Sequence, residues 1–238
     1  PLVNAVVLTH AAPSYASDGR TLVSASALGL HNDAGTEAAV RAAGRAFHWV
    51  EAALDTPAPV AAVVAAVEAK LGPIDILVNN AGTIRRADAL EFTEDDWDAV
   101  VGVNLKTAFF LAQAVARAMV AGGRGGKIIN IVSMLSFQGG VRVASYTASK
   151  SGLLGLTRLL ANEWAAKGIN VNAIAPGYFV TNNTEALRGD ANRNRAILDR
   201  IPAGRWGVPA ELGGAAVFLA SAAADYVHGA VLPVDGGW

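Results

Sequence analysis

Short runs rich in β-branched residues alternate along this chain with longer stretches rich in alanine and leucine. The runs predict strands at residues 5–9, 20–25, 46–50, 74–78, 127–132, 169–175 and 230–234. The longer stretches predict helices at residues 36–43, 57–70, 104–120, 146–166 and 209–220, and one that starts at 93–96. This alternation predicts right-handed β-α-β crossovers, and therefore a parallel sheet covered by helices on both faces.

The composition suits one large domain. Of the 238 residues, 53% are apolar and 16% are charged, which excludes a disordered chain and is enough for a large buried core. No linker, composition break or internal repeat divides the chain. We therefore expect residues 1–238 to fold as a single α/β domain around a doubly wound parallel sheet.

Charge and cysteine content exclude several classes of function. The formal net charge is −1, so the chain has no basic field to hold a nucleic acid. Cysteine is absent and the four histidines are scattered, so we expect neither disulfides nor a metal site. No uninterrupted apolar stretch approaches the ~18 residues of a membrane span, and the chain opens at Pro1 without the basic segment of a signal peptide. We expect a cytoplasmic protein with no membrane partner.

One predicted helix carries a pair of residues suited to proton transfer. Tyr146 and Lys150 are four positions apart, so their side chains share a helix face about one turn apart. A phenol ordinarily titrates at about pH 10, and a nearby ammonium lowers its pKa. The pair therefore predicts a proton donor and acceptor for carbonyl reduction or alcohol oxidation.

Further polar residues stand where predicted strands end or helices begin. Open parallel sheets bind ligands beyond the carboxyl ends of their strands. Ser133 and Asn80 each follow a predicted strand, and Asn104 begins an apolar helix. Taken singly, the first two are explained as turn residues and Asn104 as a helix cap. Their joint occurrence with Tyr146 and Lys150 favours a catalytic site.

These motifs, in this order and spacing, resemble those of the short-chain dehydrogenase/reductase family over residues 36–238. The matching motifs are Asn79-Asn80-Ala81-Gly82, Asn104, Ser133, Tyr146-Thr147-Ala148-Ser149-Lys150 and Pro176-Gly177. The resemblance implies a doubly wound sheet, a nicotinamide cofactor and an oxidoreductase that transfers a hydride between this cofactor and a secondary alcohol or ketone.

The resemblance also implies roles for single residues. Tyr146 is then the acid/base, and Ser133 orients the substrate carbonyl. Lys150 lowers the Tyr146 pKa and holds the nicotinamide ribose, while Asn104 positions a water in the proton relay. The residues implied to bind the cofactor are Asn80, Ala81, Gly82, Tyr146, Lys150, Pro176, Gly177 and Thr181.

A narrower resemblance concerns the substrate. Residues 79–92, 133–140, 175–178, 181–184 and 201–207 are similar to the branch of dehydrogenases that act on 2-deoxygluconate and 2-dehydro-3-deoxygluconate. This branch implies a deoxy sugar acid as substrate. A carboxylate needs a cation, and an arginine fork binds it through two hydrogen bonds. The residues expected to contact the substrate are Arg86, Gln138, Arg142 and Arg205, although any single arginine could equally be a solvated surface charge.

The first 35 residues depart from the family pattern. The expected T-G-x-x-x-G-x-G signature lets the backbone approach a pyrophosphate at a helix N-terminus. Residues 10–19 after Thr9 carry no such glycine triad. Only about ten residues separate the first two predicted strands, too few for a crossover helix, so we expect a shortened or irregular first β-α-β unit. Alternatively, residues 24–30 replace the signature and residues 21–23 form the first strand.

The same departure bears on the cofactor. Without the glycines, we expect dinucleotide binding to be weak. NAD is favoured over NADP, because residues 21–37 contain no arginine or lysine for a 2′-phosphate and Asp33 would repel one.

Three functions remain open, in the order in which the residues favour them. The first is a working dehydrogenase. The second is a cofactor-free family member that acts as a binding or assembly subunit. The third is a dehalogenase-like relative, although such relatives have arginine in place of Lys150 and lack the motif at residues 79–82. In each case we expect a homotetramer, because the predicted helices at residues 104–120 and 151–160 are apolar or small on nearly every face.

Overall fold

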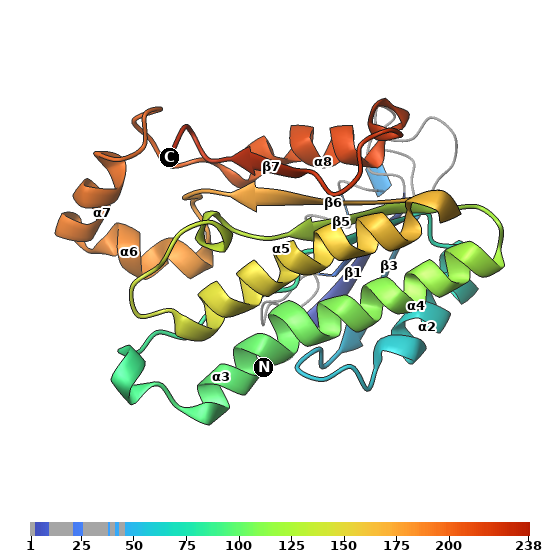
Figure 1. Cartoon of the computed structure of the whole chain (residues 1–238), viewed down its shortest axis with the longest axis horizontal. Coiled ribbons are helices and arrows are strands. Elements are labelled where there is room, and N and C mark those ends of the chain that lie inside the picture. The colour runs from blue at the N-terminus through green and yellow to red at the C-terminus, as the bar shows by residue number, and fades with distance from the viewer. Residues whose placement is uncertain (1–2, 10–20, 26–37, 39–40, 43–45) are drawn as a thin grey trace.

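The computed structural model describes residues 3–9, 21–25, 38, 41–42 and 46–238. They form a seven-stranded sheet in the order β3-β1-β2-β4-β5-β6-β7 (Figure 1). The strands are β1 (Val3–Thr9), β2 (Thr21–Ala25), β3 (Phe47–Ala52), β4 (Ile76–Asn79), β5 (Gly126–Ile131), β6 (Ile169–Pro176) and β7 (Val231–Val234). Every strand that the sequence predicts is present, with ends shifted by a residue or two.

The direction of the strands divides the sheet into two regions. From β2 through β4, β5, β6 and β7 all neighbours run parallel, as predicted. β1 instead runs antiparallel to both of its neighbours, β2 and β3. The connection between β1 and β2 is too short for a crossover helix, whereas antiparallel neighbours need only a short connection. The irregular first unit is thus an antiparallel strand inserted into a parallel sheet.

β2 lies beside β4, the place that the first strand of a doubly wound sheet ordinarily takes. This position agrees with the alternative in which residues 21–23 form the first strand. The remaining N-terminal expectations lie outside the described residues. They concern the segment at 10–19, the phosphate loop beyond Ala25, Asp33 and most of the helix at 36–43.

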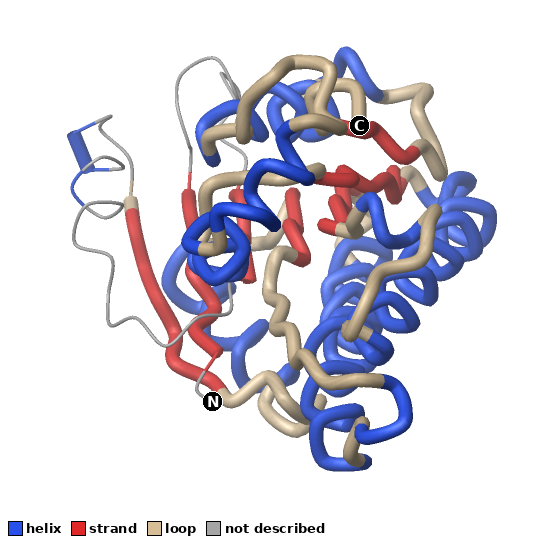
Figure 2. The backbone as a smooth tube through the Cα atoms, turned by 90° about the vertical axis from the view of Figure 1, so that its left-hand side faces the viewer, coloured by secondary structure: helices blue, strands red, loops and turns tan. Residues whose placement is uncertain are grey.

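Helices cover both faces of the sheet (Figures 1 and 2). On one face, Leu77 and Ile128 pack into a core shared with α2 (Val60–Leu71), α4 (Ala108–Ala121) and α5 (Ala144–Trp164). On the other face, Ile76 and Ile129 pack against Leu219 of α8 (Gly213–Ala220). Adjacent residues of one strand therefore serve opposite cores, because successive side chains of a strand point to opposite faces.

The helix bounds follow from capping and glycine stops. The helices are α2 (Val60–Leu71), α3 (Glu94–Val101), α4 (Ala108–Ala121), α5 (Ala144–Trp164), α6 (Glu185–Gly189), α7 (Ala191–Leu198) and α8 (Gly213–Ala220). Short 3-10 turns occur at Ala89–Glu91, Met134–Ser136, Ala165–Lys167, Asn182–Thr184, Pro209–Leu212 and Ala222–Ala224. Thr93 caps α3 by accepting a hydrogen bond from the Asp96 amide at 3.2 Å, as its acidic first turn indicates. The sequence analysis predicted neither α6 nor α7.

α3 and α4 are joined into one helical stretch by a π-helical turn, η2 (Gly102–Thr107). The helix start predicted at Asn104 is wrong, because the helix continues through this residue. The whole stretch, Glu94–Ala121, is 28 residues long and apolar enough to cross a bilayer by length and composition. The 18-residue segment of highest mean hydropathy within this stretch is 56% buried inside the protein. Buried core helices of soluble proteins can have the same length and hydropathy.

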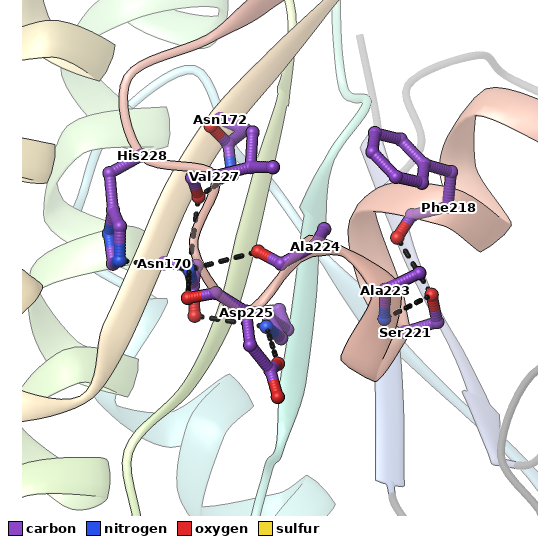
Figure 3. A network of polar contacts seen from close by, with 10 residues as sticks. Asn170, Asn172, Phe218, Ser221, Ala223, Ala224, Asp225, Val227 and His228 are labelled. Carbon is purple, nitrogen blue, oxygen red and sulfur yellow. Dashed lines mark hydrogen bonds and ion pairs between the residues drawn. The ribbon is translucent and has the colours of Figure 1, made fainter.

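A polar network holds the segment before β7 to the amino end of β6 (Figure 3). The Asn170 amide donates to the carbonyls of Ala224, Asp225 and Val227 at 2.9–3.2 Å. Asn172 donates to the Val227 carbonyl at 2.8 Å and accepts from the Ala230 amide at 2.9 Å. These bonds satisfy buried amides and place the start of β7.

Candidate functional site

A cavity of about 350 Å³ opens at the carboxyl ends of β5 and β6, the edge at which the sequence predicts ligand binding. Ser133 reaches it from just beyond β5 and Tyr146 from the first turn of α5. Its other walls come from the loop after β4, the segment before α5, the end of β6, residues 183–200 and Trp238. Segments far apart in the sequence therefore face one partly open cavity.

Ser133 and Tyr146 meet in this cavity. Ser133 caps the turn after β5, accepting a hydrogen bond from the Leu135 amide at 3.2 Å, which fixes where its hydroxyl lies. Burial raises the pKa of the Tyr146 phenol, while a hydrogen bond with the Ser133 side chain and the charge of Arg86 oppose the rise. The phenol is therefore a proton donor at neutral pH, and the two hydroxyls can share one substrate oxygen.

Lys150 lies below this pair, one turn along α5 and 3% exposed. Its ammonium donates a hydrogen bond to the Ile131 carbonyl at 2.5 Å, at the end of β5. Burial lowers its pKa to about 8. The ammonium nitrogen is 5.8 Å from the centroid of the Tyr146 ring.

The sequence argument expected Lys150 to lower the Tyr146 pKa. In the structure the net pKa shift of Tyr146 is upward, because loss of hydration outweighs the favourable contacts. The contributions that lower this pKa come from Ser133 and Arg86.

Asn104 is fully buried at the π-helical turn. Its amide accepts a hydrogen bond from the Thr83 backbone N–H at 2.8 Å and donates to the Thr83 carbonyl at 2.9 Å and the Ser149 hydroxyl at 3.2 Å. Asn104 thus connects the loop after β4 to α5. A π-helical turn within an α-helix frequently marks a functional site, because it redirects a side chain.

Gly102, the first residue of the turn, lies against the loop after β3. A Cβ atom at this position would lie 2.3 Å from the Asp55 carbonyl oxygen. Only a glycine therefore allows the turn to approach this loop so closely.

The loop after β4 leaves space beside the lysine. Asn80 is exposed and Ala81 and Gly82 are half-buried. A Cβ atom at Gly82 would lie 3.6 Å from the Lys150 ammonium nitrogen and 3.5 Å from the Asn104 side-chain oxygen. Both are van der Waals distances, so a glycine here leaves this side of the buried Lys150 ammonium without a covering side chain.

The residues after β6 close the same edge. Pro176 and Gly177 line the cavity, and a Cβ atom at Gly177 would lie 2.7 Å from the Asp235 Cα atom. Thr181 does not line it. Its backbone N–H donates to the Thr184 hydroxyl at 3.1 Å, which starts the turn that leads into α6.

The predicted substrate contacts divide into two groups. Arg86 and Gln138 line the cavity. Arg142 and Arg205 do not, because each is paired with an acid outside it. Arg142 lies 3.1 Å from an Asp88 carboxylate oxygen, and Arg205 donates to both carboxylate oxygens of Glu211, at 2.6 and 2.9 Å.

The cavity lining also includes charged and aromatic residues that the sequence did not indicate. Arg193 and Arg200 reach the cavity from α7 and the segment after it, and Trp238 from beyond β7. Asp190 caps α7, because its carboxylate accepts hydrogen bonds from the Asn192 and Arg193 backbone N–H groups at 3.0 Å. An aspartate before a polar segment is an N-cap signal that could have found α7, and with it Arg193.

The chain matches the family model described as enoyl-(acyl carrier protein) reductase over residues 9–238. A 2-dehydro-3-deoxy-D-gluconate 5-dehydrogenase from Dickeya dadantii (strain 3937) is 61% identical over 199 residues, covering 84% of this chain and 79% of the relative.

Solved structures agree with these relatives. A protein of Agrobacterium tumefaciens described as a 2-deoxy-D-gluconate 3-dehydrogenase, with NADP bound, is 68% identical with a TM-score of 0.70, covering 75% of this chain and 73% of that one. A gluconate 5-dehydrogenase from Burkholderia cenocepacia J2315, in complex with NADP and tartrate, is 49% identical with a TM-score of 0.75, covering 77% and 72%.

Proposed function

Since the chain belongs to the short-chain dehydrogenase/reductase family, we propose that it interconverts a secondary alcohol and a ketone on a sugar acid, with a nicotinamide dinucleotide as hydride carrier. One observation carries the proposal. Ser133 and Tyr146 meet in a cavity whose lining includes arginines but no acidic residue among those described. Relatives that act on gluconate and 2-dehydro-3-deoxygluconate support the same substrate class.

Proton transfer follows from the state of the phenol. With its pKa raised, Tyr146 holds its proton at neutral pH and donates it to the oxygen of a ketone as that oxygen becomes an alcohol. Ser133 holds the same oxygen through its hydroxyl. In the reverse direction Tyr146 must first lose its proton, so we expect alcohol oxidation to accelerate at alkaline pH.

The residues around Lys150 fit the nicotinamide end of a dinucleotide. The space beside Gly82, the buried ammonium with hydrogen-bond donors beyond the one used by Ile131, and the Pro176-Gly177 turn suit a ribose and an amide. When bound, this cofactor carries the hydride. Asn80, Ala81 and Gly82 would border it, Lys150 would bind the ribose hydroxyls, and Asn104 would keep the loop after β4 in place.

We propose NAD as the physiological dinucleotide, because residues 21–37 offer no arginine or lysine to a 2′-phosphate. The two solved relatives with NADP bound support the phosphorylated form instead. Calorimetry with NADH, NADPH and nicotinamide mononucleotide decides between them. We expect weak binding with NADH tighter than NADPH; tighter NADPH binding overturns the choice.

We also propose a cytoplasmic homotetramer. Large apolar side chains are exposed on α4 and α5, including Phe110, Val120 and Leu159. Contact between copies of the chain would cover them. Light scattering tests the assembly, and a monomer mass at working concentration contradicts it.

The activity itself is tested by absorbance of the reduced nicotinamide. The purified chain is mixed with gluconate, 2-deoxygluconate or 2-dehydro-3-deoxygluconate and with each dinucleotide in turn. We expect turnover with at least one sugar acid. Folded protein that gives no turnover with any pair and binds no dinucleotide, yet binds a sugar acid, would favour a cofactor-free binding or assembly role.

A further inference from the structure

The cavity beside Tyr146 carries more positive charge than proton transfer requires. Arg86, Arg193 and Arg200 line it, and no aspartate or glutamate of the described residues does. Guanidinium groups that face one cavity repel one another unless an anion lies between them. The cavity is therefore suited to a negatively charged ligand.

Arg86 is oriented but not neutralised. Its Nη2 atom donates to the Asn183 carbonyl at 2.9 Å, a neutral acceptor. Burial lowers the pKa of Arg86, and the charge of Arg193 lowers it further, while Tyr146 opposes the change. Arg86 is thus within electrostatic range of both Arg193 and the acid/base residue.

Arg193 is held by its backbone and free at its side chain. Its amide donates to the Asp190 carboxylate at 3.0 Å, which sets the start of α7. Within the part of the chain that the structure describes, its guanidinium has no hydrogen bond or ion pair. Ala196 and Ile197 of the same helix also line the cavity, so this face of α7 is turned toward it.

Arg200 differs from the other two. Its guanidinium lies over the Trp238 ring, 3.9 Å from the centroid, and stacking on an aromatic face already stabilises it. Among the described residues, Arg193 is the one of these three whose guanidinium has neither a hydrogen bond nor an aromatic partner.

We propose that Arg193 and Arg86 together bind the carboxylate of the substrate, and that Arg193 makes the enzyme select acids over neutral polyols of the same length. The inference rests on the proposed function, since it identifies how that site holds a sugar acid. A carboxylate accepts paired hydrogen bonds from a guanidinium fork, and between two guanidiniums it also removes their repulsion. A neutral hydroxyl or amide group offers neither gain.

The test is calorimetry of D-gluconate and D-gluconamide, which differ at the acid group, on wild-type protein and variants. We expect Arg193→Ala to weaken gluconate binding by about tenfold to a hundredfold, the usual cost of losing charged hydrogen bonds. Gluconamide binding should change by no more than about twofold. Arg193→Lys should restore part of the affinity, because the charge returns without the fork.

The matched control is Arg195→Ala, on the same helix. The Arg195 side chain is 83% exposed and lies 3.8 Å from the Asp199 carboxylate, outside the cavity lining. Removing it should leave gluconate binding within about twofold of wild type. A loss equal to that of Arg193→Ala would indicate a general effect of charge and overturn the proposal.

Other outcomes separate this inference from the proposed function. The carboxylate site is refuted if wild-type protein binds gluconate no more tightly than gluconamide, or if Arg193→Ala binds gluconate as wild type does. Turnover is measured on the same samples. If gluconate binding depends on Arg193 but no dinucleotide supports turnover of any sugar acid, the proposed function fails and the carboxylate site stands.

Discussion

The strands β6 and β3 represent the two regions of the sheet. β6 lies between β5 and β7, runs parallel to both, and is buried at seven of its eight positions. β3 is an edge strand paired only with the antiparallel β1, and one of its six positions is buried. The cavity opens at the end of β6, whereas β3 contributes no residue to its lining. The cavity thus opens beside the strands that are buried on both faces, and Ser133 lies just beyond one of them, β5.

This contrast between β6 and β3 predicts that a substitution in the cavity beside β5 and β6 can abolish turnover without disturbing the fold. Tyr146→Phe deletes one hydroxyl and should lower kcat by about a thousandfold, the usual worth of a general acid. Circular dichroism and the unfolding midpoint should stay near wild type. Tyr226→Phe is the control, since Tyr226 is 99% exposed and outside the cavity. Activity retained by Tyr146→Phe would show that another group transfers the proton.

Substitutions in β6 and in β3 should differ in how much they lower the free energy of unfolding. Ile174 of β6 is 1% exposed and packs on α8, so Ile174→Ala should cost about 2–5 kcal/mol in free energy of unfolding. His48→Ala in β3, where the side chain is half-buried, should cost about 0.5 kcal/mol. Urea unfolding of both variants measures the contrast. Equal losses would mean that the edge strand is as tightly packed as the centre.

The pH dependence of stability should reveal the buried lysine. The pKa of Lys150 is about 8 in the folded protein against the ordinary 10.5. As the pH rises, the folded protein therefore loses the Lys150 proton at a lower pH than the unfolded chain does. Stability therefore rises between these two pH values, by about 3 kcal/mol in total, and below pH 8 the protein bears the full cost of the buried charge. Relative to Lys150→Met, wild-type protein should gain stability from pH 7 to pH 10. A difference that stays constant or shrinks would contradict the buried charge.

Gly102 tests whether the two regions are coupled. Gly102→Ala forces a Cβ atom against the Asp55 carbonyl in the loop after β3, and such overpacking costs about 1–3 kcal/mol. Because Asn104 follows within the same π-helical turn, we also expect kcat to fall. Gly155→Ala is the control, since a Cβ atom there would meet nothing within 4 Å. A stable variant with normal kcat would show that the loop after β3 yields without affecting the site.

The same contrast explains what the sequence could predict. β4, β5 and β6 are runs rich in Ile and Val, and Asn79, Ser133 and Pro176 lie at or just beyond their carboxyl ends, so both the strands and the edge that carries the site follow from pattern. β1 and β2 were recognised as strands, but their antiparallel pairing was not, because β-branched residues favour a strand without fixing its direction. Only the short connection between the two strands indicated an irregular pairing.

The arginines show a second limit. Arg86, Arg142 and Arg205 look equivalent in the sequence, yet Asp88 and Glu211 pair with two of them in space. Pairing depends on contacts between residues that the pattern does not place, whereas the helical spacing of Tyr146 and Lys150 follows from local geometry. Arg193 was overlooked because α7 is short and polar, and no apolar periodicity marks it.

The two asparagines of β6 have a consequence for the far end of the sheet. Asn170 and Asn172 bind the segment before Val231, and through it they set which residue of β7 faces which side. A slip of one residue would leave these amides without partners and turn every following side chain over. Trp238, which follows β7, would then no longer line the cavity. The two asparagines at the amino end of β6 therefore fix the register of β7, and through this register they determine the shape of a cavity at the opposite end of the strand.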